Sequence, residues 1–400
     1  MKEKVLKNEA DFDKLIREKK FAFGQIGDAE TLVIFTFEFE LKKDSMSEGG
    51  VPEKFDFFNC VFKEKVSVKI LERNFRFEGC QFEKTFVCRD SEFKGKARLR
   101  NCVFHGTTDF RNTKFIDLAD FWRSTFMERA IFYKTDFQGI TVFSAATFEK
   151  NVLFTYALIE KPILFRGTTL KAGIDLSTAI IPGNIGTYGL SFGDFRTKNG
   201  KLNDDDYEKA ISESGDIPIK NKRETFRILK QANIQQNNAI ESIPFQVLEK
   251  KTLLTELTTS ISRKKSKSEK ESWIEFLAEK WNSIWDLVVL FLNWISNSFG
   301  RAPFQSAIFT LLVGAIFFYL NITQTEKYDI ALNWEWEIVC TEIPNYVRFI
   351  LPTHSLQYME DPKFYEKYAV TNWYYLWDML GRIFIGFGIY QTIQAFRKFR

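Results

Sequence analysis

Residues 119–132 read ADFWRSTFMERAIF, with phenylalanine at 121, 126 and 132 and a small residue two positions before each one. The same alternation of five- and six-residue steps continues in both directions. It forms a ladder of apolar residues at Phe77, Phe82, Cys88, Phe93, Leu99, Phe104, Phe110, Phe115, Phe121, Phe126, Phe132, Phe137, Phe143, Phe148, Phe154, Ile159, Phe165, Leu170, Leu176 and Ile181. Such steps do not hold one face of an α-helix with 3.6 residues per turn. A short fixed period instead predicts a repeat architecture.

A second ladder of small or apolar residues, none of them charged, stands two positions before the first. Alternate residues of a strand share a face, so both ladders point inward. Polar residues between them, such as Asp109, Asp120 and Asp136, point outward. Each unit is then a short strand and a corner, and four units complete one square turn. About five turns, with strands about 4.8 Å apart, predict a rod about 25 Å long.

These ladders resemble the pentapeptide-repeat family, whose units place a small residue two positions before a central Leu or Phe. The alternation of five and six resembles the Phe-rich variant of that repeat. The resemblance implies a right-handed quadrilateral β-helix, a pentapeptide-repeat solenoid, over residues 53–181. Some members of the family mimic DNA with an acidic surface. Residues 53–181 contain more Lys and Arg than Asp and Glu, which argues against a DNA mimic here.

The register is less regular before Phe77. Phe55-Asp-Phe57, Cys60-Val-Phe62 and Val66-Ser-Val68 fit three more units, and a shortened unit must follow Val68. The open end of a solenoid needs a cap. We expect residues 1–52 to form it, with a short helix at 11–19 and one half-buried edge strand at 31–40.

Composition limits the functional classes. A net charge of +4 is too small to indicate a nucleic-acid partner. Five cysteines without a CxxC motif or a Cys/His cluster predict no metal site. The sequence shows no catalytic triad and no phosphate-binding glycine loop, so we expect neither an enzyme nor a cofactor. The N-terminal residues lack the apolar core of a signal peptide, which predicts a cytosolic coil with reduced thiols.

After the coil, a Gly-, Asp- and Asn-rich connection is expected at 182–220, beginning at Pro182-Gly183. A helical hairpin neck follows at 221–262. Its helices are predicted at 221–235, with Asn221 as N-cap, and at 239–261. The pair either packs on itself and on the last coil or forms a dimer.

Residues 263–300 combine a basic run with a Trp-rich helix predicted at 271–299. The basic side chains suit anionic lipid headgroups, and the tryptophans suit the membrane interface. We expect lipid contacts from Arg263, Lys264, Lys265, Lys267, Trp281, Trp285 and Trp294. The alternative is that residues 281–299 span the membrane or re-enter it.

Residues 301–400 are predicted to form a transmembrane hairpin. Its spans are expected at 303–322 and 373–395, each long enough to cross about 30 Å. Arg301 precedes the first span and Arg397 follows the second. The positive-inside rule therefore places both termini in the cytosol and the loop 323–372 outside. The whole outline resembles bacterial inner-membrane proteins that fuse pentapeptide repeats to a short transmembrane domain.

Two polar features mark the spans. Asp378 and Arg382 are four residues apart on one helix face and can pair. One interpretation is that this pair lines a pore or an oligomer interface. The other is that it lies near the outer membrane interface and only fixes the depth of the helix in the membrane. Small residues at Ser306, Thr310, Gly314 and Gly386 are expected to allow close helix packing, in the hairpin or in an oligomer.

Two functional hypotheses follow. In the first, the protein is a membrane-anchored scaffold or sensor whose coil binds an unidentified protein. In the second, it is a subunit of a homo-oligomeric ion-conducting pore gated by the coil. A single two-helix hairpin cannot enclose water, so the second hypothesis requires several subunits.

Overall fold

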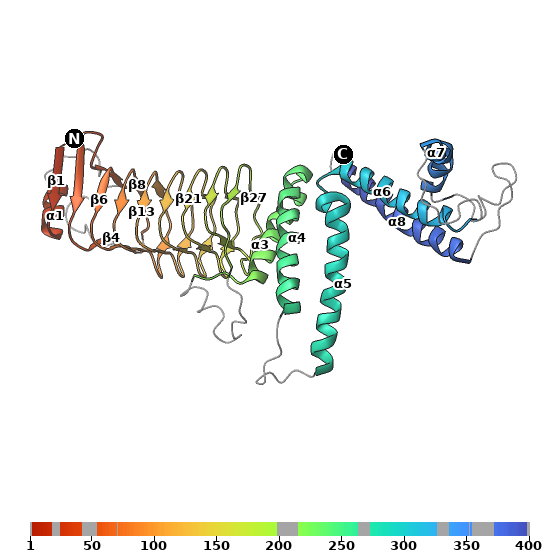
Figure 1. The fold of residues 1–400 in the computed structure, drawn as a ribbon. Coiled ribbons are helices and arrows are strands. Elements are labelled where there is room, and N and C mark those ends of the chain that lie inside the picture. The colour runs from red at the N-terminus through yellow and green to blue at the C-terminus, as the bar shows by residue number, and fades with distance from the viewer. Residues whose placement is uncertain are drawn as a thin grey trace. The chain divides into compact units, whose positions relative to one another are not determined.

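The computed structural model describes residues 2–17, 25–41, 54–69, 71–197, 215–262, 273–325, 336–351, 353 and 372–397. The chain divides into two compact units, Met1–Thr252 and Leu253–Arg400. The first unit is a β-solenoid of about six turns over residues 56–192, closed by helices (Figure 1). The second unit is α-helical.

Four parallel sheets form the sides of the solenoid, and we name each sheet by its first strand. The β1 sheet contains β1 (Lys2–Leu6), β3 (Thr31–Phe35), β6 (Cys60–Phe62), β9 (Gln81–Phe82), β13 (Val103–Phe104), β17 (Thr125–Phe126), β21 (Thr147–Phe148), β25 (Thr169–Leu170) and β28 (Ser191–Phe192). The β2 sheet contains β2 (Gln25–Ile26), β5 (Lys54–Phe58), β8 (Asn74–Glu78), β12 (Ala97–Arg100), β16 (Ala119–Asp120), β20 (Thr141–Val142), β24 (Ile163–Leu164) and β27 (Ile185–Gly186).

The other two sheets complete the square. The β4 sheet contains β4 (Phe39–Leu41), β7 (Val66–Val68), β10 (Phe86–Val87), β14 (Thr108–Asp109), β18 (Ala130–Ile131), β22 (Val152–Leu153) and β26 (Ile174–Asp175). The β11 sheet contains β11 (Glu92–Phe93), β15 (Lys114–Phe115), β19 (Asp136–Phe137) and β23 (Leu158–Ile159). From β9 onward each strand pairs with the strand 22 residues later, as in Phe104 opposite Phe126, which confirms the predicted period.

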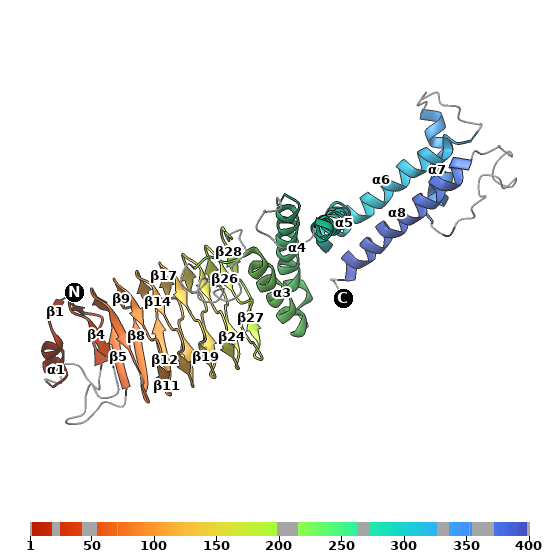
Figure 2. The ribbon, with the colours of Figure 1, turned by 90° about the horizontal axis from the view of Figure 1, so that it is seen from below.

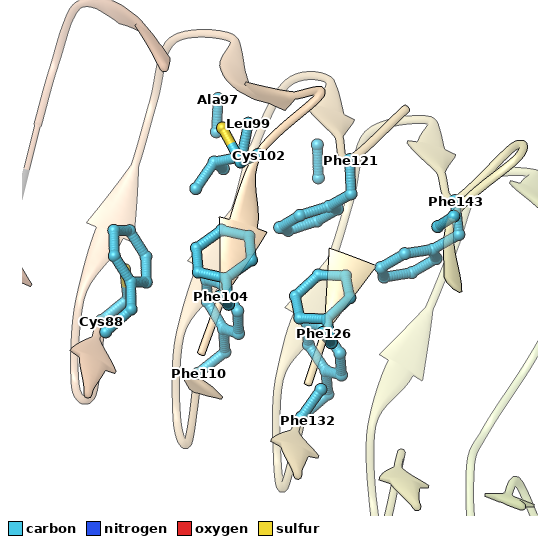
Figure 3. Close-up of a cluster of buried hydrophobic side chains, with 14 of the residues drawn as sticks. Cys88, Ala97, Leu99, Cys102, Phe104, Phe110, Phe121, Phe126, Phe132 and Phe143 are labelled. Atoms are coloured by element: carbon cyan, nitrogen blue, oxygen red, sulfur yellow. The ribbon is translucent and has the colours of Figure 1, made fainter. Parts of the chain in front are cut away.

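Phenylalanine rings fill the interior and stack from turn to turn (Figure 3). Phe104 and Phe126 stack with ring centroids 4.9 Å apart, as do Phe110 and Phe132. The residues two positions earlier face the same core. Several of them donate a hydrogen bond from a side-chain hydroxyl group to a main-chain carbonyl. Thr135 Oγ1, for example, donates to the Phe110 carbonyl at 2.7 Å. Burial of a polar side chain is tolerated when it is hydrogen-bonded in this way.

The two kinds of corner differ in backbone conformation. Five-residue steps turn through a residue with positive φ, as at Asn101 (φ 50°) and Asn112 (φ 55°). Asn is among the residues that adopt this region readily. Six-residue steps bring the backbone close to the turn below. At Gly106, an added Cβ would lie 2.5 Å from the carbonyl carbon of Lys84, so only glycine fits there without a shift.

The outward polar residues are less exposed than the sequence suggests. Asp109 accepts hydrogen bonds from Arg89 Nη2 and Arg111 Nη2, both at 2.8 Å, and is 4 % exposed. Asp120 is 2 % exposed and accepts from Arg100 Nε at 2.6 Å. Arginine side chains therefore cover these carboxylates from outside the coil.

The N-terminal region differs in part from its prediction. A helix is present, α1 (Glu9–Arg17), but the single edge strand expected at 31–40 is wrong. It is two strands, β3 and β4, which belong to different sheets and are separated by a corner. The shortened unit is confirmed, because Leu71 follows Val68 closely and bridges Phe93.

The C-terminal end of the coil lies later than predicted. The predicted boundary at 181 is wrong, because β27 pairs with β24 and β28 pairs with β25. The Gly-rich sequence of residues 183–193 conceals this last rung, although Ile185 and Phe192 keep the 22-residue period from Ile163 and Leu170.

Helices α3 (Ile219–Gln235) and α4 (Ala239–Ser262) match the two predicted neck helices. Phe226 and Leu229 of α3 are buried in the solenoid core, and Phe245 of α4 joins them. The helices therefore cap the last coil, which confirms the first of the two expectations. Asn221 is not the N-cap, which is Pro218. Asn221 lies inside α3 and donates to Asp175 of the last coil at 3.0 Å.

The second unit contains α5 (Trp273–Asn297), a short 3-10 turn η2 (Ser298–Gly300), α6 (Pro303–Ile322), α7 (Trp336–Ile350) and α8 (Asn372–Phe396). Helices α6 and α8 cover the two predicted spans. Helix α7 was not predicted and lies within the expected outer loop 323–372.

Candidate functional site

Helices α6 and α8 pack as an antiparallel hairpin. Asn321 Nδ2, near the end of α6, donates to the Tyr374 carbonyl near the start of α8 at 3.1 Å. At the other end Thr310 lies against Gly388, where an added Cβ would be 2.4 Å from Thr310 Oγ1. The buried stripe of α6 is Ser306, Thr310, Gly314, Phe318 and Asn321. The hairpin thus places its small and polar residues inside.

The structure separates the four predicted packing residues. Thr310 packs on α8, whereas Gly314 faces Tyr346 and Ile350 of α7. Ser306 is buried and donates to the Pro303 carbonyl at 2.6 Å. Gly386 has nothing within 4 Å of its Cβ direction, so it is not a packing position within the chain. Its packing in an oligomer remains a prediction.

Two glycines of α8, Gly381 and Gly388, pack against neighbouring helices, and of these Gly381 was missed. Gly388 meets Thr310, and an added Cβ at Gly381 would lie 2.7 Å from Phe349 Cζ. Their spacing of seven residues, in phase with buried Tyr374 and Ile385, is a signal that the sequence offered.

The predicted pair Asp378 and Arg382 is brought together. Arg382 Nε donates to Asp378 Oδ2 at 2.8 Å. The Asp378 side chain is fully buried, and that of Arg382 is 23 % exposed. Arg382 Nη2 is buried and has no hydrogen-bond partner. Within one chain the carboxylate therefore faces the interior of the hairpin.

Helix α7 docks on the middle of α6. Tyr346 Oη donates to the carbonyl of Leu311 at 2.5 Å, and Phe349 packs on Phe318 with ring centroids 5.6 Å apart. The segment 323–372, expected as an outer loop, therefore contains a helix that packs on α6. The sequence did not predict this contact, because the aromatic residues of α7 are spread along the helix and form no continuous apolar run.

A buried polar joint connects α5 to the hairpin. Asn297 Nδ2 donates to Gln391 Oε1 of α8, and its Oδ1 accepts from the Gly300 backbone N–H at 2.8 Å. The chain turns sharply here through Ser298 (φ 49°) and Phe299 (φ 61°). The sequence Asn-Ser-Phe-Gly before Pro303 is the only signal for this turn.

Helix α5 exposes its tryptophans. Trp281, Trp285 and Trp294 are 60 %, 54 % and 50 % exposed. In Figure 2 α5 is seen nearly end-on while α6 and α8 run lengthwise, so α5 crosses the direction of the hairpin. The basic residues Arg263, Lys264, Lys265 and Lys267 lie outside the described residues.

Length and hydropathy select α6 among the described helices as long and apolar enough to cross a membrane, with a mean hydropathy of 1.7. Only 28 % of its apolar window is buried. Helix α8 does not pass this test, so the second predicted span is not established by composition.

The solenoid carries one shallow hollow of about 560 Å³ beside its last turns. Its lining mixes both charge signs, and Lys171 pairs with Glu149 there at 2.7 Å. Within the described ranges no group of three or more His, Cys, Asp or Glu residues is arranged to hold a metal ion.

Comparison with known proteins identifies the repeat. Residues 89–136 match the family model of pentapeptide repeats (9 copies). No curated protein and no solved structure gives a significant match to the chain. The family match and the strand pairings agree on the solenoid.

Proposed function

We propose that this pentapeptide-repeat protein is a membrane-anchored scaffold, in which a right-handed cytosolic solenoid binds a partner protein near the inner leaflet. Helices α6 and α8 form the two-span anchor, and α5 lies in the interface with its tryptophans at headgroup level. Both termini are cytosolic in this arrangement, as the basic residues Arg301 and Arg397 favour.

The observation that carries the anchor is the exposed apolar surface of the hairpin. Leu312 and Ile316 of α6 are 61 % and 58 % exposed, and Ile383 of α8 is 59 % exposed. The polar residues Asn321 and Asp378 lie inside. Apolar outside and polar inside suits a hydrocarbon solvent, in which polar groups must find partners within the protein.

The composition of α8 fits this reading. Its polar residues Asp378 and Gln391 are buried, whereas Met379 and Ile393 are about half exposed or more, at 50 % and 58 %. Asp378 and Gln391 lower the mean hydropathy of the helix but do not face the lipid, whereas Gln394, near the end of the helix, is exposed. We therefore propose α8 as the second span although its composition alone does not indicate one.

The scaffold role rests on the form of the solenoid. Its interior is filled by phenylalanine rings that stack from turn to turn, so its binding surface is the outside of the coil. Its outside offers regularly spaced side chains on a surface held by the strand ladder. Repeat proteins commonly use such extended surfaces for binding.

The test places a charge on the exposed face of α6. Leu312 lies near the middle of a helix about 30 Å long. Leu312→Asp should release the protein from membranes at high pH, since a central Asp costs about 2.5–3.5 kcal/mol of insertion free energy. Phe304→Asp, at the end of the helix, is the control and should stay in the membrane fraction. Release of the wild-type protein by the same wash would reject the anchor.

A second candidate, an oligomeric pore, is favoured by the docking of α7 on the middle of α6. A helix that meets a span at half its length re-enters the membrane if α6 crosses it. Irregular chain at that depth is tolerated where protein or a water-filled cavity surrounds it. The buried Asp378–Arg382 pair lies in the same hairpin.

Sizing of the protein in detergent separates the two candidates. A monomer would rule out the pore. If the protein is an oligomer that conducts ions in liposomes, Asp378→Asn and Arg382→Gln should alter the flux, and unchanged flux would remove this pair from the mechanism.

A further inference from the structure

One edge of the solenoid differs from the others in charge. This edge, between the β2 and β1 sheets, contains three outward columns of residues. From Arg100 onward these columns hold Arg100, Trp122, Ser144, Arg166 and Tyr188; Asn101, Arg123, Ala145, Gly167 and Gly189; and Val103, Thr125, Thr147, Thr169 and Ser191. No position among them is acidic. We call these three columns the arginine edge.

Backbone hydrogen bonds establish that the edge is continuous. Arg123 N donates to the Ser144 carbonyl at 3.0 Å, and Ala145 N donates to the Arg166 carbonyl at 2.8 Å. Arg123 and Arg166 are therefore two rungs apart, which is about 10 Å along the rod.

Two of the arginines are free to bind a partner. Arg100 is neutralised by Asp120, but Arg123 and Arg166 make no ion pair within the described part of the chain. Each lies instead over an aromatic ring. The Arg123 guanidinium is 5.3 Å from the centroid of Trp122, and that of Arg166 is 5.4 Å from the centroid of Tyr188. When the flat face of a guanidinium group packs on an aromatic ring, the N–H donors in the guanidinium plane are still able to bind a carboxylate.

The aromatic rings are themselves exposed, Trp122 by 37 % and Tyr188 by 67 %. Trp, Tyr and Arg are the residues that most often dominate binding energy at interfaces. Ser144, Ala145 and Gly167 lie between the two arginines along the edge. Their side chains are small, so they do not block access of a partner to this surface. The edge thus has two anchors about 10 Å apart and aromatic surface beside each.

We propose that the arginine edge binds an acidic, proline-rich segment of a partner protein in the polyproline II conformation. That helix has three residues per turn and rises about 3.1 Å per residue, so carboxylates at positions i and i+3 share a face about 9 Å apart. This spacing matches Arg123 and Arg166. The intervening prolines would lie on Trp122 and Tyr188, since aromatic surfaces are the usual receptors for this helix.

The opposite edge, between the β4 and β11 sheets, has a similar cation–aromatic pair but also contains acidic residues. It carries a similar pair, Lys134 over Tyr133 at 5.2 Å. Its columns also contain carboxylates at Asp90, Glu92 and Asp136. The same columns contain the cations Arg89, Arg111 and Lys114, of which Arg89 and Arg111 pair with Asp109. This edge therefore presents charges of both signs to an acidic segment, whereas the arginine edge presents no carboxylate, and the two edges form a matched pair.

The experiment measures binding of a fluorescent Glu-Pro-Pro repeat peptide to the full-length protein in detergent by anisotropy. Arg123→Glu should weaken binding by at least about tenfold, because like charges then face each other. Lys134→Glu is the control, since it makes the same charge change at an equivalent corner (φ 52° against 56°) and should leave binding unchanged. Equal melting temperatures of the two variants show that both fold.

Several results would overturn the inference. These are equal loss of binding in Lys134→Glu, equal affinity for a Lys-Pro-Pro repeat, or tighter binding of single-stranded DNA than of the acidic peptide. The inference rests on the proposed scaffold role. Membrane retention is scored separately with Leu312→Asp, so a retained wild-type protein that does not bind the peptide rejects this partner class and leaves the anchor standing.

Discussion

Phenylalanine is common in both units, but among the described residues it is strongly exposed only in the helical unit. In the solenoid Phe104 and Phe126 are fully buried and stack on each other. In the helical unit Phe304 is 77 % exposed and Phe291 is 51 % exposed. Phe318 and Phe349 of the helical unit are buried, so this unit has an aromatic core and, in addition, exposed rings that suit the proposed membrane anchor.

The buried polar residues also differ between the units. The solenoid covers the carboxylates of Asp109 and Asp120 with arginine side chains from its outer surface, whereas the hairpin encloses Asn321 and Asp378 between its helices. This contrast, more than any single residue, supports a chain that works at a boundary between water and lipid.

The largest expected effect removes a ring from the middle of a stack. Phe126→Ala should destabilise the solenoid by about 3–5 kcal/mol, because it leaves a cavity between Phe104 and Phe148. Phe304→Ala should change the stability by less than about 0.5 kcal/mol, as exposed positions do. Thermal unfolding followed by circular dichroism measures both. Equal effects would abolish the contrast between the units.

An intermediate effect tests the interior of the hairpin. Gly388→Leu forces a side chain into Thr310 and should cost about 1–3 kcal/mol. Gly386→Leu enters open space and is the matched control. Unfolding of the helical signal in detergent compares them. If Gly386→Leu is the more damaging variant, that glycine packs against another subunit.

The smallest effect concerns the charged shell of the solenoid. Burial raises the pKa of the Asp109 carboxyl, but hydrogen bonds from Arg111 and Arg89 outweigh this and lower the pKa overall. The ionised carboxylate therefore stabilises the fold above the unfolded pKa of about 4, and this stabilisation is lost as the pH falls through the folded value. The difference in melting temperature between the wild type and Asp109→Asn should shrink below about pH 4. The exposed Asp117→Asn is the control, and a difference that grows on acidification would contradict the assignment.

The solenoid was predictable because each of its residues repeats a local rule. A strand of two residues needs one inward Phe and one small neighbour, and the sequence supplies this pair at nearly every unit from Phe77 to Ile181. The rule failed at the final rung, where Thr187 stands at the position that Phe165 holds one turn earlier. There the pairing of Ile163 with Ile185 continues the sheet without a strong local signal.

The contacts of the helical unit were predictable only in part. The spacing of Asp378 and Arg382 on one helix was sufficient to predict their pairing, because both lie on the same turn-to-turn face. The docking of Tyr346 on Leu311 joins residues 35 positions apart through a backbone carbonyl. No periodicity in the sequence records a partner of that kind, and the joint at Asn297 and Gln391 was missed for the same reason.

The interior of the first turns has one more consequence. Cys60, Cys80 and Cys102 occupy successive rungs of the same column, each sealed from water, and Cys88 is buried nearby, where burial raises the pKa of its thiol. A thiol reacts as the thiolate and only when a reagent can reach it. Their alkylation therefore requires the amino-terminal coils to open, and at a reagent concentration high enough for alkylation to outpace reclosing the rate of thiol loss measures the rate of that opening.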